Sequence, residues 1–373
     1  MIHFTQSDAR QPRGAVKVNG ELITGWTLFE IDNNGFFSAD SFRCTFANAA
    51  LPVDRNAAWF SEQQDMFVEL FIGFPPDANS YTPAQLQSWI YGQVDDIDLD
   101  PVTNTIEVTG RDLTRLMIDT KTTEKWPNKT SSQIATLIAQ AHGLTPVVQA
   151  TTTKAGKLYA IDFVNLAVEH SEWDILTYLA DKEGFRAWVR GQSLFFQPVP
   201  DPTKTEPYEM VWQPRTTERG VPVANFEMLK LQRSLTVSRG IQVVIRSFNA
   251  KTGKALTVAF PPNKPKSIKV GKSTVGQGSQ VYTKTIPGLD RAAALQRAQN
   301  WYQQLVAHEM KMQFAFPGDN SLDVTSIVKL SGTGTAWDQN YYPDSISRVM
   351  TINGGYALSG HAKNHSPESE VSL

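Results

Sequence analysis

Two segments of the sequence come close to known catalytic motifs. The segment His308-Glu309-Met310-Lys311-Met312 begins like the helix of a zinc protease, but Met312 stands where the second zinc-binding histidine is required. A single imidazole cannot hold a catalytic zinc ion. The segment Gly271-Lys272-Ser273-Thr274 resembles the end of a phosphate-binding loop, but Lys266 replaces that loop's first glycine. We therefore interpret neither segment as a catalytic or binding site, and the second as a surface turn.

Other arrangements typical of enzymes and metal proteins are missing from the sequence. No Gly-x-Ser-x-Gly elbow occurs, and the six histidines show no metal-binding spacing. Asp181 and Glu183 could form an acid pair, but residues two apart on a helix point away from each other, which favours a solvated face. The sequence therefore predicts no enzymatic activity, no metal site and no cofactor.

The single cysteine, Cys44, excludes an intrachain disulfide and any metal site built from several cysteines. Phe42 and Phe46 lie two residues to either side, so on a strand all three side chains share one face. This pattern predicts a buried structural thiol rather than a reactive one.

Three aspartates in the segment 96–100 suggest a physical role without catalysis. On a strand, the period of two places Asp96, Asp98 and Asp100 on one face, with Ile97 and Leu99 on the other. An acidic face that lines a passage would repel a nucleic-acid backbone and keep it from sticking. The alternative interpretation is the wet side of a half-buried hairpin.

The segment 261–287, which is rich in glycine, proline and lysine, is a second feature that suggests a physical role without catalysis. Loops of this length are usually functional or disordered. We expect it either to contact an acidic neighbour, protein or DNA, or to be a solvated flap. Its lysines are Lys264, Lys266, Lys269, Lys272 and Lys284.

Composition narrows the class of protein. The 373 residues are 41% hydrophobic and 19% charged, with a formal net charge of −2. This balance argues against a general nucleic-acid binder, which needs clustered lysine and arginine. The many aromatic residues indicate extensive burial, some of it between subunits. The start of the chain has no signal-peptide pattern, and no apolar run approaches the ~18 residues of a spanning helix, so we expect synthesis in a cytoplasm and no membrane-spanning segment.

Local patterns in the sequence predict its strands and helices. The first hundred residues predict antiparallel strands at 26–31, 41–46, 66–74 and 89–99, the last pairing with 105–109, which is typical of a sandwich or barrel. In the middle, two capped helices are predicted at 130–143 and 171–184, and an aromatic hairpin follows the second.

The last third returns to β-structure after a stretch at 198–222 in which recurring prolines indicate a linker or an irregular edge. Strands are predicted at 229–237, 240–248, 255–260, 311–316, 326–330, 345–352 and 356–363. The longest helix is predicted at 290–308, with one apolar stripe formed by Leu295, Ala298, Tyr302 and Leu305.

Three separated parts of the sequence resemble the phage late control gene D and baseplate hub family, which is related to the hub part of type VI secretion spike proteins. The first is the strand, Gly-Arg turn and helix at 106–116. The second is the helix and hairpin at 171–196. The third combines 328–332, 341–346 and 354–356, similar to closing strands with a glycine-rich hairpin. The ordered set carries the resemblance, since each part alone is mainly core and turn residues.

The resemblance implies an α+β, mainly β fold with two tail-tube-like antiparallel β-barrel domains flanking small α/β domains. We expect a first barrel at 1–117, an α/β middle region at 118–225, a second barrel at 226–365 and a frayed tail at 366–373. Three such chains would present six barrels, and would join a sixfold tail tube to a threefold spike.

The resemblance also implies partners and a location. A late virion protein of the tail baseplate is expected, acting in tail assembly, DNA ejection and host entry as a homotrimer. Its expected partners are the tail tube protein, a separate spike or central tip protein, the tape measure protein and other baseplate proteins. Genomic DNA would pass without specific recognition, which favours the channel-lining interpretation of Asp96, Asp98 and Asp100.

Two alternatives stay open at this stage. A tail-associated cell-wall glycan hydrolase would need a carboxylate pair across a cleft, and the sequence supplies no recognisable one. A carbohydrate-binding module could use the nine tryptophans as stacking surfaces.

Overall fold

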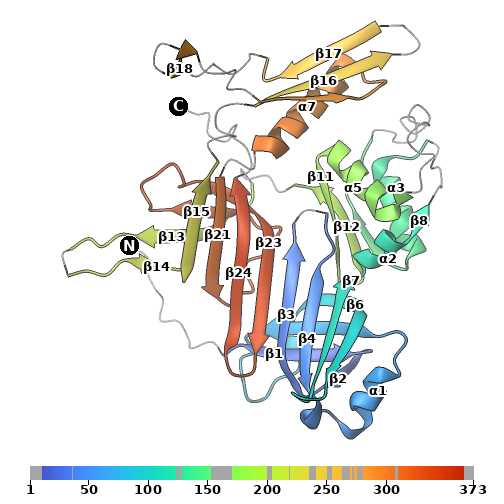
Figure 1. The fold of residues 1–373 in the computed structure, drawn as a ribbon, viewed down its shortest axis with the longest axis vertical. Helices are drawn as coiled ribbons and strands as arrows, with labels where there is room; N and C mark the ends of the chain where they lie inside the picture. The colour runs from blue at the N-terminus through green and yellow to red at the C-terminus, as the bar shows by residue number, and fades with distance from the viewer. Residues whose placement is uncertain are drawn as a thin grey trace.

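The computed structural model describes residues 11–35, 37–122, 126, 128–152, 170–199, 204–217, 219–234, 241–249, 254–262, 269–270, 273–274, 280–306 and 310–364. One large sheet dominates the molecule, and two α/β units pack at one end of it (Figure 1). The mainly β character predicted from the sequence is confirmed.

Eight antiparallel strands form the continuous centre of this sheet. Their order is β15 (Met228–Arg233), β21 (Met310–Pro317), β24 (Gly355–Asn364), β23 (Asn340–Thr351), β3 (Trp26–Asn34), β4 (Ser41–Ala47), β7 (Thr105–Asp112) and β6 (Gln87–Asp100). The pairing of β23 with β3 joins the two ends of the chain in one sheet, as Figure 1 shows. The N-terminal and C-terminal β regions are therefore hydrogen-bonded to each other.

The remaining strands of the sheet extend it at two places. Beyond β6 lie β5 (Phe67–Gly73), β1 (Arg13–Val18) and β2 (Glu21–Ile23). Beyond the first residues of β23 lie β22 (Val328–Ser331), β13 (Tyr208–Gln213) and β14 (Val223–Ala224). Strand pairing among the described residues does not close on itself, so the two barrels stay a prediction, as do the domain borders.

Strand β13 lies inside the proline-rich stretch that predicted a linker or irregular edge. Pro207 and Pro214 flank this strand without interrupting it, so its backbone is free to pair in parallel with β22. The sequence reasoning therefore missed a strand there.

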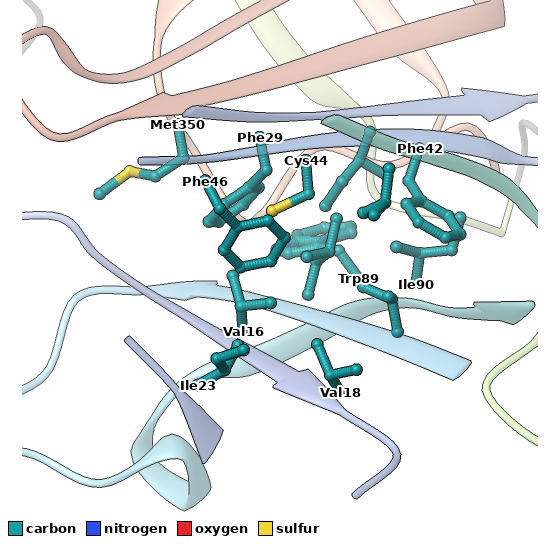
Figure 2. Packing of buried hydrophobic residues seen from close by; sticks show 14 of the residues in the cluster. Val16, Val18, Ile23, Phe29, Phe42, Cys44, Phe46, Trp89, Ile90 and Met350 are labelled. Carbon is teal, nitrogen blue, oxygen red and sulfur yellow. The ribbon is translucent and has the colours of Figure 1, made fainter. Parts of the chain in front are cut away.

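The N-terminal core lies between two layers of this sheet. Figure 2 shows Phe29, Cys44 and Phe46 above Val16 and Ile23 of the facing layer. Cys44 has no exposed surface, and burial raises the pKa of its thiol well above the ordinary value. The prediction of a buried structural cysteine is confirmed.

The first α/β unit contains α2 (Thr114–Asp119), α3 (Ser131–Ala141), α5 (Glu172–Glu183) and the strands β9 (Thr145–Val148), β11 (Phe185–Arg190) and β12 (Ser193–Pro198), with the short pair β8 (Lys121–Thr122) and β10 (His170–Ser171) beside it. Both predicted capping boxes form, at Thr130 and at Ser171. Gly184 ends α5 in the left-handed conformation, with a φ of 71°.

The second α/β unit is inserted between β15 and β21. It packs α7 (Arg291–Val306) on β17 (Lys254–Phe260), β16 (Ile241–Asn249) and β20 (Gln280–Thr285). Two predictions were wrong here. The expected loop 261–287 contains β20, which pairs in parallel with β16. Leu295 is 39% exposed and does not belong to the buried stripe of α7, whereas the predicted Ala298 is buried together with Ala294, and the predicted Tyr302 and Leu305 pack against them.

The smaller elements are η1 (Asn48–Ala50), η2 (Val53–Arg55), α1 (Ala57–Ser61), η3 (Pro83–Gln85), β18 (Lys269–Val270) and β19 (Ser273–Thr274). Within the described residues, no helix is long and apolar enough to cross a membrane.

Candidate functional site: the polar face of the large sheet

One face of the eight-stranded run carries polar and small side chains in register. The rows can be followed from strand to strand, because cross-strand partners point to the same side. One row consists of Val349, Glu30, Arg43, Thr109 and Asp96, and the next of Thr351, Leu28, Thr45, Glu107 and Asp98. The alternate residues, such as Phe29, Ile31 and Val108, are fully buried in the core. The sheet therefore has one core face and one polar face, which we call the polar face.

Several acidic side chains on the polar face are hydrogen-bonded. Glu30 accepts a 2.7 Å hydrogen bond from Arg43 and a 3.2 Å bond from the Ser347 hydroxyl. Glu107 accepts a 3.2 Å bond from the Thr45 hydroxyl. Burial raises the pKa of Asp32, and its hydrogen bond with Ser347 opposes that shift. These contacts cross from β23 through β3 and β4 to β7.

The structure places Asp96 and Asp98 on the polar face, both exposed, opposite Thr109 and Glu107. Asp100 differs from them because it ends the strand. Its Oδ1 accepts backbone hydrogen bonds from Val102 at 2.8 Å and Thr103 at 3.2 Å. Hydrogen bonds from Thr103 and Val102 lower the pKa of Asp100. Asp100 thus holds the hairpin turn, and the channel-lining role of the three aspartates stays a prediction.

Asp95 is a neighbouring carboxylate that the sequence reasoning missed. A break in the pairing register between Val94 and Asp96 sets it apart from the alternating pattern. Asp95 accepts a 2.7 Å hydrogen bond from Arg111 and lies 3.1 Å from Nη1 of Arg115. The bond from Arg111 is the main cause that lowers its pKa. The Gly-Arg motif at 110–111 therefore has a structural role in bracing the hairpin against α2.

Of the predicted lysine contact residues, Lys264, Lys266 and Lys272 lie outside the described residues. Lys269 belongs to β18, which pairs with β19. Lys284 lies on β20, with its ammonium 5.6 Å from the centre of the Trp301 ring. The contact role of these lysines stays a prediction.

The eight-stranded run ends in an open edge on both sides. Among the described residues, β15 pairs only with β21. Residues 95–100 of β6 pair only with β7, because β5 pairs with 87–93. Unpaired strand edges are rarely left exposed in natural proteins. These two edges are therefore candidate contact sites.

A buried polar cluster lies on the core side, where β23 meets β3. Arg348 has no exposed surface. Its Nη1 donates to Asn33 Oδ1 at 2.8 Å, and its guanidinium stacks 3.5 Å from the centre of the Trp89 ring. Nothing local in the sequence marks Arg348 for burial, since its partners come from residues far away in the chain.

Two carboxylates share this region. Asp40 accepts 2.7 Å hydrogen bonds from the Asn34 backbone and the Asn33 side chain, yet burial raises its pKa to about 6. Asp112 is buried, and burial followed by repulsion from Asp40 raises its pKa well above the usual range. We assign the pair a structural role on the core side of the sheet.

The candidate acid pair Asp181 and Glu183 is engaged in structural contacts. Asp181 lies 2.8 Å from Nη2 of Arg297, and Glu183 accepts a 2.6 Å hydrogen bond from the Ser131 hydroxyl. In the part of the chain that the structure describes, no three histidine, cysteine or acidic side chains gather in a way that could hold a metal ion.

Comparison with known proteins shows which solved structures share this fold. No protein-family model and no curated protein matches the sequence. Among solved structures, a tail protein from Neisseria meningitidis MC58 superposes with a TM-score of 0.66 at 14% identity, covering 95% of this chain and 97% of that one. The 43 kDa tail protein of prophage MuSo2 from Shewanella oneidensis gives 0.59 at 14%, covering 94% and 97%.

A third similar structure is a type VI secretion component of E. coli, described as structurally similar to T4 bacteriophage tail proteins gp27 and gp5. It gives a TM-score of 0.51 at 10% identity, covering 94% of this chain and 77% of that one. Identities this low establish the fold alone. The chain has the fold of phage tail proteins over nearly its whole length, which confirms the resemblance seen in its sequence.

Proposed function

We propose that this protein is a structural component of a phage tail or tail-like particle, namely the baseplate hub. The fold supports this role because it is shared, over nearly the full chain, with tail proteins and a secretion component. Its partners in this role are the tail tube protein, a spike, the tape measure protein and other baseplate proteins. No enzymatic activity is part of the proposal.

The observation that carries the trimeric hub is the pair of open edges. Strand β15 and residues 95–100 of β6 end the eight-stranded run, and seven successive antiparallel pairings make these two strands run in opposite directions. β6 of one copy can therefore meet β15 of the next in the antiparallel manner of every other pair in the run. Such contacts between unlike edges generate rings when the rotation closes.

The polar face supports a channel in that ring. Arg43 on this face is paired with Glu30, and Asp96 and Asp98 add exposed negative charge near one edge. Negative charge on a channel wall repels a passing phosphate backbone. We propose that the polar face, including Asp96 and Asp98, lines the passage for genomic DNA.

The mass of the particle in solution tests the trimer. Light scattering or native mass spectrometry of the full chain should give three times the chain mass of 41.5 kDa. The trimer should also co-assemble with its tail tube protein. A monomer that persists at high concentration and fails to co-assemble would overturn the proposed hub.

A further inference from the structure

A groove with a volume of about 330 Å³ lies between helix α3 and strand β9, at the edge of the three-stranded sheet of the first α/β unit. Its wall includes Thr136 and Leu137 of α3, together with Val148 of β9 and Ala150 just beyond this strand. Leu137 is 40% exposed, although other residues of α3 are buried in the core of the unit. The groove therefore offers an apolar surface against which a further side chain can pack.

Among the described residues, the backbone of β9 is paired on one side only. The strand order of this sheet is β11, β12, β9, and the last two strands run in parallel. The amides of Thr145 and Gln149 each donate to a carbonyl oxygen at or beside β12, over 2.9 Å. Successive residues of a strand turn their backbone groups to opposite sides in the plane of the sheet. Val148 and Ala150 therefore turn their amides and carbonyl groups away from β12.

Pro146 agrees with this assignment, because it occupies an alternate position of the same set as Val148 and Ala150. Proline has no N–H and is tolerated in a strand where the amide faces an open edge. Val148 and Ala150 thus keep the donors that Pro146 lacks, and both belong to the wall of the groove. The part of the edge that can still accept a strand coincides with the groove.

Lys129 places a positive charge in the wall of the groove, next to the first turn of α3. At this end the backbone amide of Thr151 donates to Ser132 Oγ at 3.1 Å, and the amide of Ser132 donates to Thr151 Oγ1 at 3.0 Å. This reciprocal pair holds the chain after β9 against the helix, so the groove is preformed. Lys129 is exposed, and no ion pair engages it within the described part of the chain. The groove is therefore complementary to a ligand with an acidic group at this end.

We propose that α3 and β9 form a docking groove for an extended segment of a partner protein, which adds to the free edge of β9 as a further strand. Val148 and Ala150 supply the backbone hydrogen bonds, an apolar side chain of the segment packs on Leu137, and a carboxylate pairs with Lys129. The volume suits one or two side chains, as alternate residues of a strand point to the same side. Figure 1 shows α3 on the outer side of the first α/β unit, away from β24. The groove contains no residue of the large sheet, so the proposal does not depend on the trimeric ring.

Calorimetric titration of the full-length protein with a synthetic peptide tests the docking groove. The probe is an acetylated, amidated peptide of alternating valine and threonine with glutamate at both ends. One control peptide has lysine at both ends, and another is N-methylated at every residue. We expect one glutamate peptide to bind per chain, the lysine peptide to bind roughly threefold more weakly or worse, and the N-methylated peptide not to bind. The glutamate peptide should also slow hydrogen exchange at the amides of Val148 and Ala150, but not at that of Gln149, which already bonds to β12.

Variants of the chain separate the docking groove from unspecific adsorption. Ala150→Pro removes an outward amide and no bond to β12, and should weaken peptide binding about three- to tenfold. Lys129→Glu should reverse the preference between the two charged peptides, whereas Lys121→Glu, at an exposed position of β8, should leave it unchanged.

Three results would overturn the docking groove. The glutamate and lysine peptides could bind equally well, or the Val148 and Ala150 amides could exchange at the same rate with and without peptide. These amides could also be protected in the concentrated protein alone and lose that protection on dilution, in which case the edge pairs with a second copy of the chain. The mass of the particle is measured separately, so each of these results leaves the test of the trimer intact.

Discussion

The half-buried carboxylate Asp40 and the buried carboxylate Asp112 make the stability of this protein depend on pH. Both pKa values are raised in the folded state, that of Asp40 from 3.8 to about 6. Between these pH values the folded state binds a proton that the unfolded state has released. The free energy of unfolding therefore falls as the pH rises from about 4 to about 6, by an amount on the order of 2 kcal/mol.

Asp112→Asn tests this linkage at the residue scale. Asp112 accepts hydrogen bonds from the backbone and the hydroxyl of Thr114, and an asparagine retains both contacts because the hydroxyl can also accept. The asparagine has no proton to release on unfolding, so urea unfolding at pH 4, 6 and 7.5 should show a smaller loss of stability as the pH rises. Asp96→Asn, on the exposed polar face, is the matched control. An unchanged slope in Asp112→Asn would contradict the linkage.

At the scale of elements, the Gly-Arg motif marks a tight packing of three strands. A Cβ at Gly110 of β7 would lie 2.3 Å from the Gln93 carbonyl oxygen of β6 and 2.7 Å from the Phe42 ring of β4. Figure 2 shows Phe42 in this core. Glycine is therefore required at Gly110 so that the strands and the ring can approach each other.

Gly110→Ala should destabilise the protein by about 1–3 kcal/mol, as overpacking of a core does. The change in free energy of unfolding can be measured by urea denaturation. Gly191→Ala is the control, since its added Cβ meets nothing within 4 Å and costs only the strain of its φ of 57°. Combining Gly110→Ala with Phe42→Leu should recover part of the loss. Equal effects of the two glycine changes would refute the packing argument.

Some helices and strands of this fold could be predicted from the sequence, and others could not. Capped helices and strands follow from neighbouring residues, as with Thr130 and Gln133 or the alternation around Cys44, and these predictions are confirmed. Strand β20 was missed because its pairing with β16 is remote in the chain. The pairing of β3 with β23 has no local signal either, although it positions the polar face.

The residues of the candidate site likewise include some that local sequence patterns predict and some that only the tertiary fold brings together. Alternation in β6 correctly predicted that Asp96, Asp98 and Asp100 share a face, with Asp100 also accepting the hydrogen bonds of the turn, whereas Asp95 lies at the break in register. The buried cluster around Arg348 depends on side chains brought together from distant segments. Such sites need the tertiary fold before they can be recognised.

At the scale of the whole molecule, eight strands in one antiparallel run have a consequence for assembly. An even number of strands gives every seam between copies the same antiparallel geometry as the pairs within a copy. Three copies joined in this way would form a ring with no open edge on the polar face, which removes the aggregation hazard of β15 and β6.

Cysteine cross-linking between copies tests this seam independently of the particle mass. Asp98→Cys on β6 should form a disulfide with a cysteine at Met228, Lys230 or Gln232 on β15 of a neighbouring copy. Opposed strands bring one of these Cα atoms within the roughly 4–7 Å that a disulfide spans. The native Cys44 is buried and does not interfere. Non-reducing electrophoresis after mild oxidation should show covalent dimers and trimers only for the double variants.

The exposed Val53 of η2, outside the sheet, supplies the control pair, Asp98→Cys with Val53→Cys. This pair should give no more cross-linked product than either single variant. If trimers form in solution but no β6–β15 pair cross-links above this control, the copies meet through other surfaces and the edge-to-edge ring is wrong. If one position on β15 reacts and its neighbours do not, that position fixes the register of the seam, and with it the rows of the polar face that become continuous around the channel.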